Sequence, residues 1–211
     1  MHTVYLDNAA TSFPKPPMVG ARMREYVDEV GAPVNRGSYE AAQQAELVTL
    51  RLRQRLCALF GFADPSHVIL TPGNTWGLNM LLLGALRRGD HVLVSAMEHN
   101  AVMRPLTLLA KRGVVFDRIP CDAEGRLQAD RIETMLRLNT RLVLLAHASN
   151  VSGTVQDAAA VGEICAARGI AFALDAAQTA GHIPLDFTAL HLSALSVPAH
   201  KGLMGPQGIG A

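Results

Sequence analysis

Residues 170–182, "IAFALDAAQTAGH", join an uninterrupted apolar run to a polar stretch that begins at Asp175. A short run that is apolar at every position is typical of a strand covered on both faces, and such strands belong to parallel sheets between two layers of helices. The stretch therefore predicts a central parallel strand that ends at an aspartate.

Other short β-rich runs, several of them apolar nearly throughout, lie elsewhere in the chain. They are "HVIL" (67–70), "HVLVS" (91–95), "VVFDRI" (114–119), "RLVLLAH" (141–147) and "LSALSV" (192–197). Segments with helical character precede or separate them, at 16–30, 39–60, 73–87, 101–112, 128–138 and 157–168. This alternation predicts an α/β fold with a mostly parallel sheet sandwiched by helices. Because no repeat, low-complexity tract or linker interrupts it, we expect one domain over residues 1–211.

The segment 39–60 supplies the clearest local detail. It carries Leu47, Leu50 and Leu59 near helical spacing, and it stops before Gly61. Glycine commonly follows the last turn of a helix because it adopts the left-handed conformation without strain. We therefore expect an amphipathic helix that ends at this glycine.

Composition and charge exclude several classes of protein. The chain has 211 residues and a formal net charge of +1, so it lacks the charge excess that nucleic acids and anionic membranes attract. The longest apolar run, "MLLLGAL", is too short to span a bilayer, and the strand-like start "MHTVYLDNAAT" lacks the features of a signal peptide. Three cysteines (Cys57, Cys121 and Cys165) without metal-ligand spacing fit a reducing compartment. These features predict a soluble, cytoplasmic protein without a bound metal.

Polar side chains follow several of the predicted strands. Glu98, His99 and Asn100 follow 91–95, Asn150 follows 141–147, Gln178 comes shortly after Asp175, and His200 and Lys201 follow 192–197. Ligands of open α/β sheets bind beyond the carboxyl ends of the strands. The turn "TPGNTWG", with Gly73, Asn74 and Thr75 before a helix, adds main-chain N–H groups suited to an anion.

Each of these residues alone has an ordinary structural explanation, as a helix cap, a turn residue or a surface group. Together they would bring a lysine, a carboxylate, an imidazole, amides and a phosphate-binding turn to one edge of the sheet. These groups suit pyridoxal 5′-phosphate (PLP), because a lysine forms a Schiff base with its aldehyde and a carboxylate keeps its pyridine nitrogen protonated.

The chain resembles the class V aminotransferase family of fold-type I PLP enzymes, specifically the cysteine desulfurase-like proteins. The resemblance rests on "YLDNAATSFPKP", "MEHNAVMRPL", "ASNVSGT", "DAAQTAGHIPLD" and "HKGLMGPQGIG", which occur in the order and at the separations of the family. It extends over essentially the whole chain. It implies L-cysteine or a similar amino acid as substrate.

The resemblance also implies roles for individual residues. Lys201 would bind the cofactor aldehyde and move protons at the substrate, and His99 would stack on the cofactor ring and take part in acid–base steps. Asp175 would pair with the ring nitrogen, and Gln178 would donate to the ring oxygen. The remaining implied contacts are the phosphate for Asn74, Thr75 and His200, the ring oxygen and substrate carboxylate for Asn150, and the mouth of the site for Asn8, Ala9, Ala10, Asn35 and Arg36.

Two positions depart from the family pattern. Pro198 stands where many members carry a Ser or Thr that binds phosphate, so this contact is lost, and Ser196 would need a strand shift to replace it. Trp76 stands where many relatives have a small or acidic residue. We interpret the indole as packing against its helix rather than narrowing the site.

The resemblance further implies that relatives are nearly twice as long, with a smaller C-terminal domain that carries the sulfur-accepting cysteine. We therefore expect this chain to be the cofactor-binding part of such an enzyme, with the tail "GPQGIGA" starting a strand inside the sheet and leaving main-chain groups unpaired. The three cysteines present are expected to be core or loop residues. The resemblance implies a homodimer, a sulfur-acceptor protein and a link to iron–sulfur cluster assembly. The alternatives are a selenocysteine lyase, an aminotransferase or an epimerase, or an inactive truncated protein that serves as an interaction module.

Overall fold

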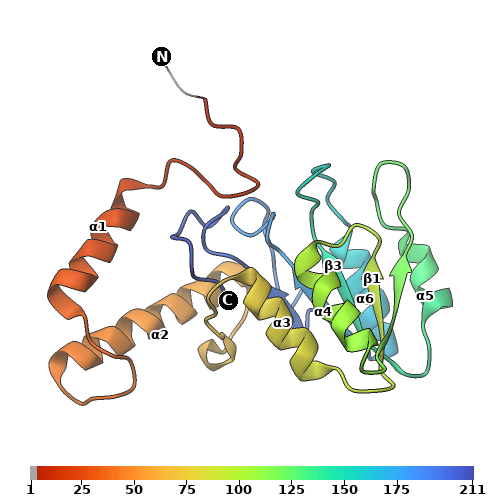
Figure 1. Cartoon of the computed structure of the whole chain (residues 1–211), viewed down its shortest axis with the longest axis horizontal. Helices are drawn as coiled ribbons and strands as arrows, with labels where there is room; N and C mark the ends of the chain where they lie inside the picture. The colour runs from red at the N-terminus through yellow and green to blue at the C-terminus, as the bar shows by residue number, and fades with distance from the viewer. Residues whose placement is uncertain (1–3) are drawn as a thin grey trace.

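The sheet at the centre of the chain is parallel and lies between two layers of helices (Figure 1). The computed structural model describes residues 4–211, and its strands lie in the order β2-β1-β3-β4-β5 with every neighbouring pair parallel. The strands are β1 (His91–Ser95), β2 (Val115–Ile119), β3 (Thr140–Ala146), β4 (Ala171–Asp175) and β5 (Ala194–Ser196). The predicted fold class and the strands near these positions are confirmed.

Both faces of the sheet are covered, as the apolar strands predict. Helices α3 (Asn74–Ala85) and α4 (Asn100–Ala110) pack on one face, and α5 (Ile132–Met135) and α6 (Ala158–Arg168) pack on the other. Val92 and Val94 of β1 belong to the first layer, whereas Leu93 between them belongs to the second, and all three are fully buried. Successive side chains of a strand point to opposite faces, so a strand between two layers must be apolar throughout.

The N-terminal helices form an arm that extends away from the sheet (Figure 1). Helix α1 (Pro17–Glu25) continues as a π-helical turn, η1 (Tyr26–Val30), and α2 (Glu40–Phe60) leads back to the sheet. Helix α2 ends at Gly61, which has a φ of 64°, as predicted. The three leucines named above are largely uncovered, because Leu47, Leu50 and Leu59 are 47%, 44% and 50% exposed. The predicted helix exists, but the residues that it buries are Ala42, Ala45, Cys57 and Phe60.

Three sequence predictions about secondary structure are wrong or too long. Residues 67–70 form no strand; a 3-10 turn, η2 (Pro65–His67), is followed by extended residues, and only Thr71 makes a bridge. The expected helix at 128–138 is a 3-10 turn, η3 (Ala129–Arg131), followed by the short α5. In the strand-like start, 1–3 lie outside the described residues and 4–7 are irregular. A strand needs a hydrogen-bonded neighbour, which local sequence does not reveal.

The glycine-rich tail is paired on both sides. Ala211 exchanges both main-chain hydrogen bonds with Val197, and Gly210 exchanges both with Thr71. The expectation that this segment leaves its main-chain groups unpaired is therefore wrong for these two residues. The tail runs antiparallel to its neighbours and is held between residues 197–199 and Thr71.

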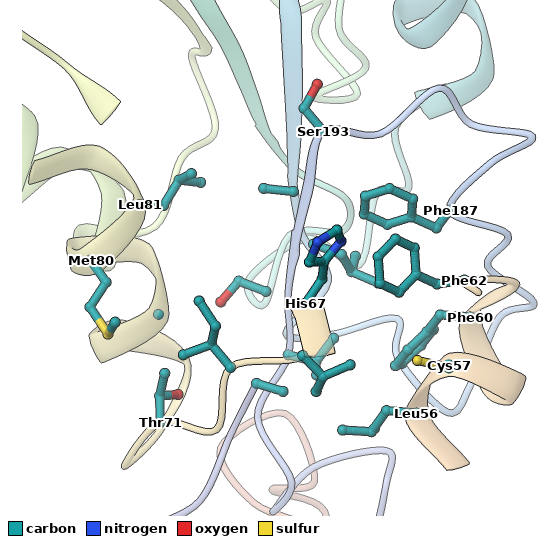
Figure 2. Close-up of a pocket in the computed structure, with 18 residues that line it drawn as sticks. Leu56, Cys57, Phe60, Phe62, His67, Thr71, Met80, Leu81, Phe187 and Ser193 are labelled. Atoms are coloured by element: carbon teal, nitrogen blue, oxygen red, sulfur yellow. The ribbon is translucent and has the colours of Figure 1, made fainter. Parts of the chain in front are cut away.

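A large apolar cavity lies beside this tail, between α2, α3 and β5. Its volume is about 590 Å³, and Figure 2 shows Phe60, Phe62 and Phe187 on one side with Met80 and Leu81 on the other. The polar residues predicted to form the site are absent from its lining.

No helix in the described part of the chain is long and apolar enough to cross a membrane.

Candidate active site

A second cavity opens where the strand order reverses. Strand β1 lies between β2 and β3, and the connection through α4 covers one face whereas those through α5 and α6 cover the other. Such a reversal leaves a crevice between the carboxyl ends of the neighbouring strands β1 and β3. The cavity has a volume of about 510 Å³ and receives residues that follow β1, β3, β4 and β5 and residues at the start of α3.

The structure brings most of the predicted site residues to this one cavity. Those in its lining are Lys201, Asp175, Gln178, His99, Asn74, Thr75, His200, Asn150, Ala9 and Ala10. They come from segments up to about 190 residues apart in the sequence, so their meeting is a property of the parallel sheet.

Asp175 is the buried carboxyl of the site, with only 3% of the residue exposed. Its Oδ1 accepts hydrogen bonds from Asn74 Nδ2 at 2.8 Å and from the Ala177 N–H at 3.0 Å. Burial raises the pKa of Asp175, and the two hydrogen bonds and the charges of His99 and Lys201 oppose the rise. Within the described chain both recorded hydrogen bonds go to Oδ1, so Oδ2 is left for a donor in the cavity.

Lys201 contributes the only lysine amine in the cavity lining among residues 4–211. No hydrogen bond joins its Nζ to another described residue. Burial lowers the pKa of Lys201, and the nearby Asp175 partly offsets the effect. A lysine amine with a lowered pKa is more often unprotonated and is therefore a better nucleophile toward a carbonyl compound.

The start of α3 faces the same cavity with Gly73, Asn74 and Thr75. The side chain of Asn74 is already engaged, because it donates to Asp175 and its Oδ1 accepts from Ser196 Oγ at 2.7 Å. The main-chain N–H of Asn74 and the second N–H of its Nδ2 therefore remain for an anion. A helix N-terminus offers such N–H groups together with the positive end of the helix dipole.

His99 and Gln178 enter the cavity with part of their hydrogen-bonding capacity used. His99 caps α4, and its Nδ1 accepts from the Ala101 N–H at 3.1 Å. Gln178 Nε2 donates to the Ala9 carbonyl at 3.0 Å. The neutral imidazole therefore carries its proton on Nε2, and the Gln178 amide keeps a second N–H for a ligand.

His200 anchors the N-terminal segment at the mouth of the cavity. Its carbonyl accepts from the Ser12 N–H at 3.0 Å and from Lys15 Nζ at 2.6 Å. Its Nδ1 lies 3.1 Å from Thr11 Oγ1. These contacts hold Ala9 and Ala10 beside the site, which explains how residues so early in the chain line it.

Three predicted residues lie outside the cavity of this chain. Asn8 turns back on its own segment, where its Oδ1 accepts from the Phe13 N–H at 3.2 Å. Asn35 and Arg36 lie in the exposed loop between η1 and α2, at the far end of the N-terminal arm (Figure 1). One chain by itself therefore does not bring these three residues to the cavity, and for Asn35 and Arg36 the reason is that their arm extends away from the sheet.

The two departures from the family pattern have different outcomes. Pro198 lines the cavity without losing a sheet bond, because the ladder uses the N–H groups of Val197 and Ala199. Ser196 cannot replace the missing hydroxyl, since it is bonded to Asn74. Trp76 is 61% exposed and lines the cavity, so the interpretation that its indole packs against the helix is wrong.

The sequence analysis assigned no role to three residues at the site. Met97 and Gln207 line the cavity. Glu98 lies behind it with an enclosed carboxyl. Met97 and Glu98 come two and three residues after the end of β1, so their position after a strand was the available signal. Gln207 belongs to the tail, and only the structure shows that the tail folds back to the cavity.

The unused groups of this cavity match one cofactor. PLP has an aldehyde that reacts with a lysine, a pyridine nitrogen whose proton needs an anion, and a phosphate that suits a helix N-terminus. Lys201 Nζ, Asp175 Oδ2 and the first N–H groups of α3 are available for these three groups. The cavity at the edge of the parallel sheet therefore offers the groups that a PLP site requires.

Comparison with known proteins specifies the family. The class V aminotransferase family matches residues 4–211. The chain is 35% identical to the cysteine desulfurase IscS of Photorhabdus laumondii over 99% of its length. Its structure superposes on the apo cysteine desulfurase of Thermococcus onnurineus with a TM-score of 0.91 at 33% identity, over 98% of this chain. It matches SspA, solved in complex with cysteine, with a TM-score of 0.91 at 27% identity, over 99% of this chain.

The chain belongs to the class V aminotransferase family. Members of this family depend on PLP. The chain spans about half the length of the curated relatives it matches: 52% of the Photorhabdus protein and 52% of the Thermococcus chain.

Proposed function

We propose that this chain is the cofactor-binding part of a PLP-dependent cysteine desulfurase. The observation that carries the proposal is the pair of Lys201 and Asp175 in one cavity, each with a functional atom that has no recorded partner in the described chain. The choice of cysteine as substrate is supported by the cysteine desulfurases among its relatives.

Bound PLP would supply an electron sink for the bond changes at the substrate. Lys201 would hold the cofactor and move a proton at the substrate Cα, and Asp175 would keep the proton on the ring nitrogen. His99 would cover the ring face, Gln178 would donate to the ring oxygen, and Asn150 would lie near the substrate carboxylate. The N–H groups of Asn74 and Thr75, with His200, would hold the phosphate.

The proposed reaction converts L-cysteine and a thiol into L-alanine and a persulfide. The Cβ–S bond breaks and the sulfur forms an S–S bond with the thiol. Of the two S–H hydrogens, one from the thiol and one from the substrate, one is transferred to Cβ and the other remains on the persulfide. The three cysteines of this chain are poor acceptors: Cys57 and Cys165 are buried, burial raises the pKa of Cys165 to about 12, and burial also raises the pKa of Cys121. A thiolate is the nucleophile, so the sulfur would go to a thiol outside residues 1–211, either the cysteine that relatives carry in their C-terminal domain or a cysteine of an acceptor protein.

The test measures alanine from L-cysteine with the PLP-loaded chain, with and without dithiothreitol. We expect alanine and sulfide in equal amounts, and only when the external thiol is present. L-selenocysteine and an amino acid with a keto-acid acceptor serve as comparison substrates. PLP binding without alanine, but with transamination or selenide release, would refute the desulfurase proposal and favour another activity of the family. The absence of PLP binding would favour the non-catalytic alternative.

We further propose that the active protein is a homodimer in which Asn35 and Arg36 complete the site of the second copy. Two observations support this: these residues lie at the end of an extended arm, and the arm exposes apolar side chains such as Met18 (64%) and Val27 (73%). Light scattering is expected to give twice the mass of one chain, and Met18→Asp with Val27→Asp is expected to give a monomer. A monomeric wild-type protein at micromolar concentration would contradict the proposal.

Two broader expectations belong to the same proposal. Residues 1–211 would form a single cofactor-binding domain, which one cooperative unfolding transition would support and two separate transitions would contradict. The cytoplasmic location is supported by the three free cysteines, and cell fractionation would check it.

A further inference from the structure

Glu98 has an enclosed carboxyl that the proposed reaction does not use. It follows β1 and directly precedes His99. Its Oε1 accepts from Ser95 Oγ at 2.6 Å and from the Ala146 N–H at 2.8 Å, whereas its enclosed Oε2 has no partner in the described chain. One oxygen is therefore fully used and the other is left without a donor.

These two bonds join the strands on either side of the crevice. Ser95 is the last residue of β1 and Ala146 is the last residue of β3, and both are buried. His99 follows Glu98 and begins α4, while residues 148–150 that follow Ala146 also line the cavity. The position of the Glu98 side chain thus affects both walls of the cavity.

The surroundings of Glu98 favour its neutral form. A buried carboxylate oxygen without a donor is costly, and a neutral carboxyl avoids most of that cost. The charged or titratable groups that face it are Asp175 at the end of β4 and Cys121 after β2. Burial, followed by the charge of Asp175, raises the pKa of Glu98 to about 7 against the hydrogen bonds from Ser95 and Ala146.

We infer that Glu98 is a positioning residue that joins the ends of β1 and β3 as a neutral carboxylic acid. It holds His99 in place over the cavity and leaves Asp175 as the negative charge available to the cofactor. This inference rests on the proposed PLP site for its functional consequence, but its protonation can be tested on the cofactor-free chain.

The pH dependence has a definite sign. The pKa of Glu98 is about 7 in the folded chain and 4.5 as the reference value, so its neutral form favours folding. This contribution is fully present below about pH 4.5 and is lost as the pH rises through about 7. The melting temperature of the cofactor-free wild type should therefore fall between pH 5.5 and 8.5, relative to a variant that cannot ionise.

The experiment compares the wild type with Glu98→Gln, Glu98→Ala and the exposed control Glu163→Gln. Glu98→Gln keeps the acceptor oxygen and imitates the neutral acid, so the amount by which its melting temperature exceeds that of the wild type is expected to be roughly 5 °C larger at pH 8.5 than at pH 5.5. Glu98→Ala removes the acceptor of both bonds and is expected to weaken PLP binding about tenfold at pH 6. Glu163→Gln should follow the wild type at each pH.

Equal pH profiles for the wild type and Glu98→Gln would overturn the inference of a neutral Glu98. A Glu98→Gln variant that binds PLP as weakly as Glu98→Ala at pH 6 would overturn its positioning role. Should Glu98→Ala fail to fold, Ser95→Ala tests one of the two bonds, and it is expected to weaken PLP binding at pH 6 more than the Glu163→Gln control. If no variant and no wild type binds PLP, the proposed function fails, while the pH profiles still decide the protonation of Glu98.

Discussion

Replacing Lys201 with alanine is expected to abolish covalent attachment of PLP. Lys201 provides the lysine amine in the cavity lining of residues 4–211, and burial lowers its pKa, which favours the unprotonated amine that reacts with an aldehyde. Wild-type chain incubated with PLP should show a visible absorption band, and borohydride should fix one cofactor per chain on the peptide that contains Lys201. In Lys201→Ala both signals should fall to background.

The matched control for this experiment is Lys111→Ala. The chain has three lysines, at positions 15, 111 and 201, and Lys111 is exposed just after α4, outside the cavity. Its replacement should leave both the band and the trapped peptide unchanged. Trapping on Lys15 or Lys111 in the wild type, or a fixed cofactor in Lys201→Ala, would show that the assignment of Lys201 is wrong.

Replacing Asp175 with asparagine is expected to weaken PLP binding without destabilising the fold. Asparagine can still accept from Asn74 and the Ala177 N–H through its Oδ1, but it loses the charge that would face the ring nitrogen. A hydrogen bond to a charged group contributes about 1.5–3 kcal/mol, which corresponds to a loss of affinity of roughly 10- to 150-fold. Fluorescence or absorption titration with PLP would measure this loss.

Although Asp175→Asn is expected to bind PLP more weakly, its cofactor-free form is expected to be at least as stable as the wild type. Burial raises the pKa of Asp175 in the folded chain, so above its folded pKa the ionised side chain costs folding free energy. Removing the charge should therefore leave the melting temperature of the cofactor-free chain unchanged or higher at pH 8. The exposed Asp130→Asn variant is the control and should change neither quantity. Unaltered PLP affinity in Asp175→Asn would contradict the proposed role of this carboxyl.

The strands illustrate what local sequence can and cannot predict. Residues 170–174 are apolar at every position, and this pattern correctly predicted a strand covered on both faces, because only a strand buried on both sides requires apolar residues throughout. Residues 68–70 are also apolar but form no strand, since in the described chain only the next residue, Thr71, makes a bridge. Apolar composition indicates burial, whereas pairing depends on neighbours that are distant in the sequence.

In the site, too, local sequence predicted which residues line the cavity but not which side chains pair with one another. The position of a polar residue after a strand was enough to predict Asp175, Gln178, Asn150 and His99 in the cavity lining, because the carboxyl ends of parallel strands meet at one edge. Pairing among side chains was not predictable. That Asn74 is engaged by Asp175 and Ser196 follows from a contact across more than a hundred residues.

The sequence by itself determined the layered α/β fold, the family resemblance and most of the residues that line the cavity. These features can be read from the sequence because the spacing of apolar residues and the type of residue that follows a strand are local properties of the chain. Only the tertiary structure decided that Asn35 and Arg36 lie away from this cavity, that Trp76 lines it, and that the carboxyl of Glu98 is enclosed between β1 and β3. The first outcome depends on the direction of the N-terminal arm. The last depends on the burial of the Glu98 carboxyl and on the hydrogen-bond donors around it, which come from segments far apart in the chain.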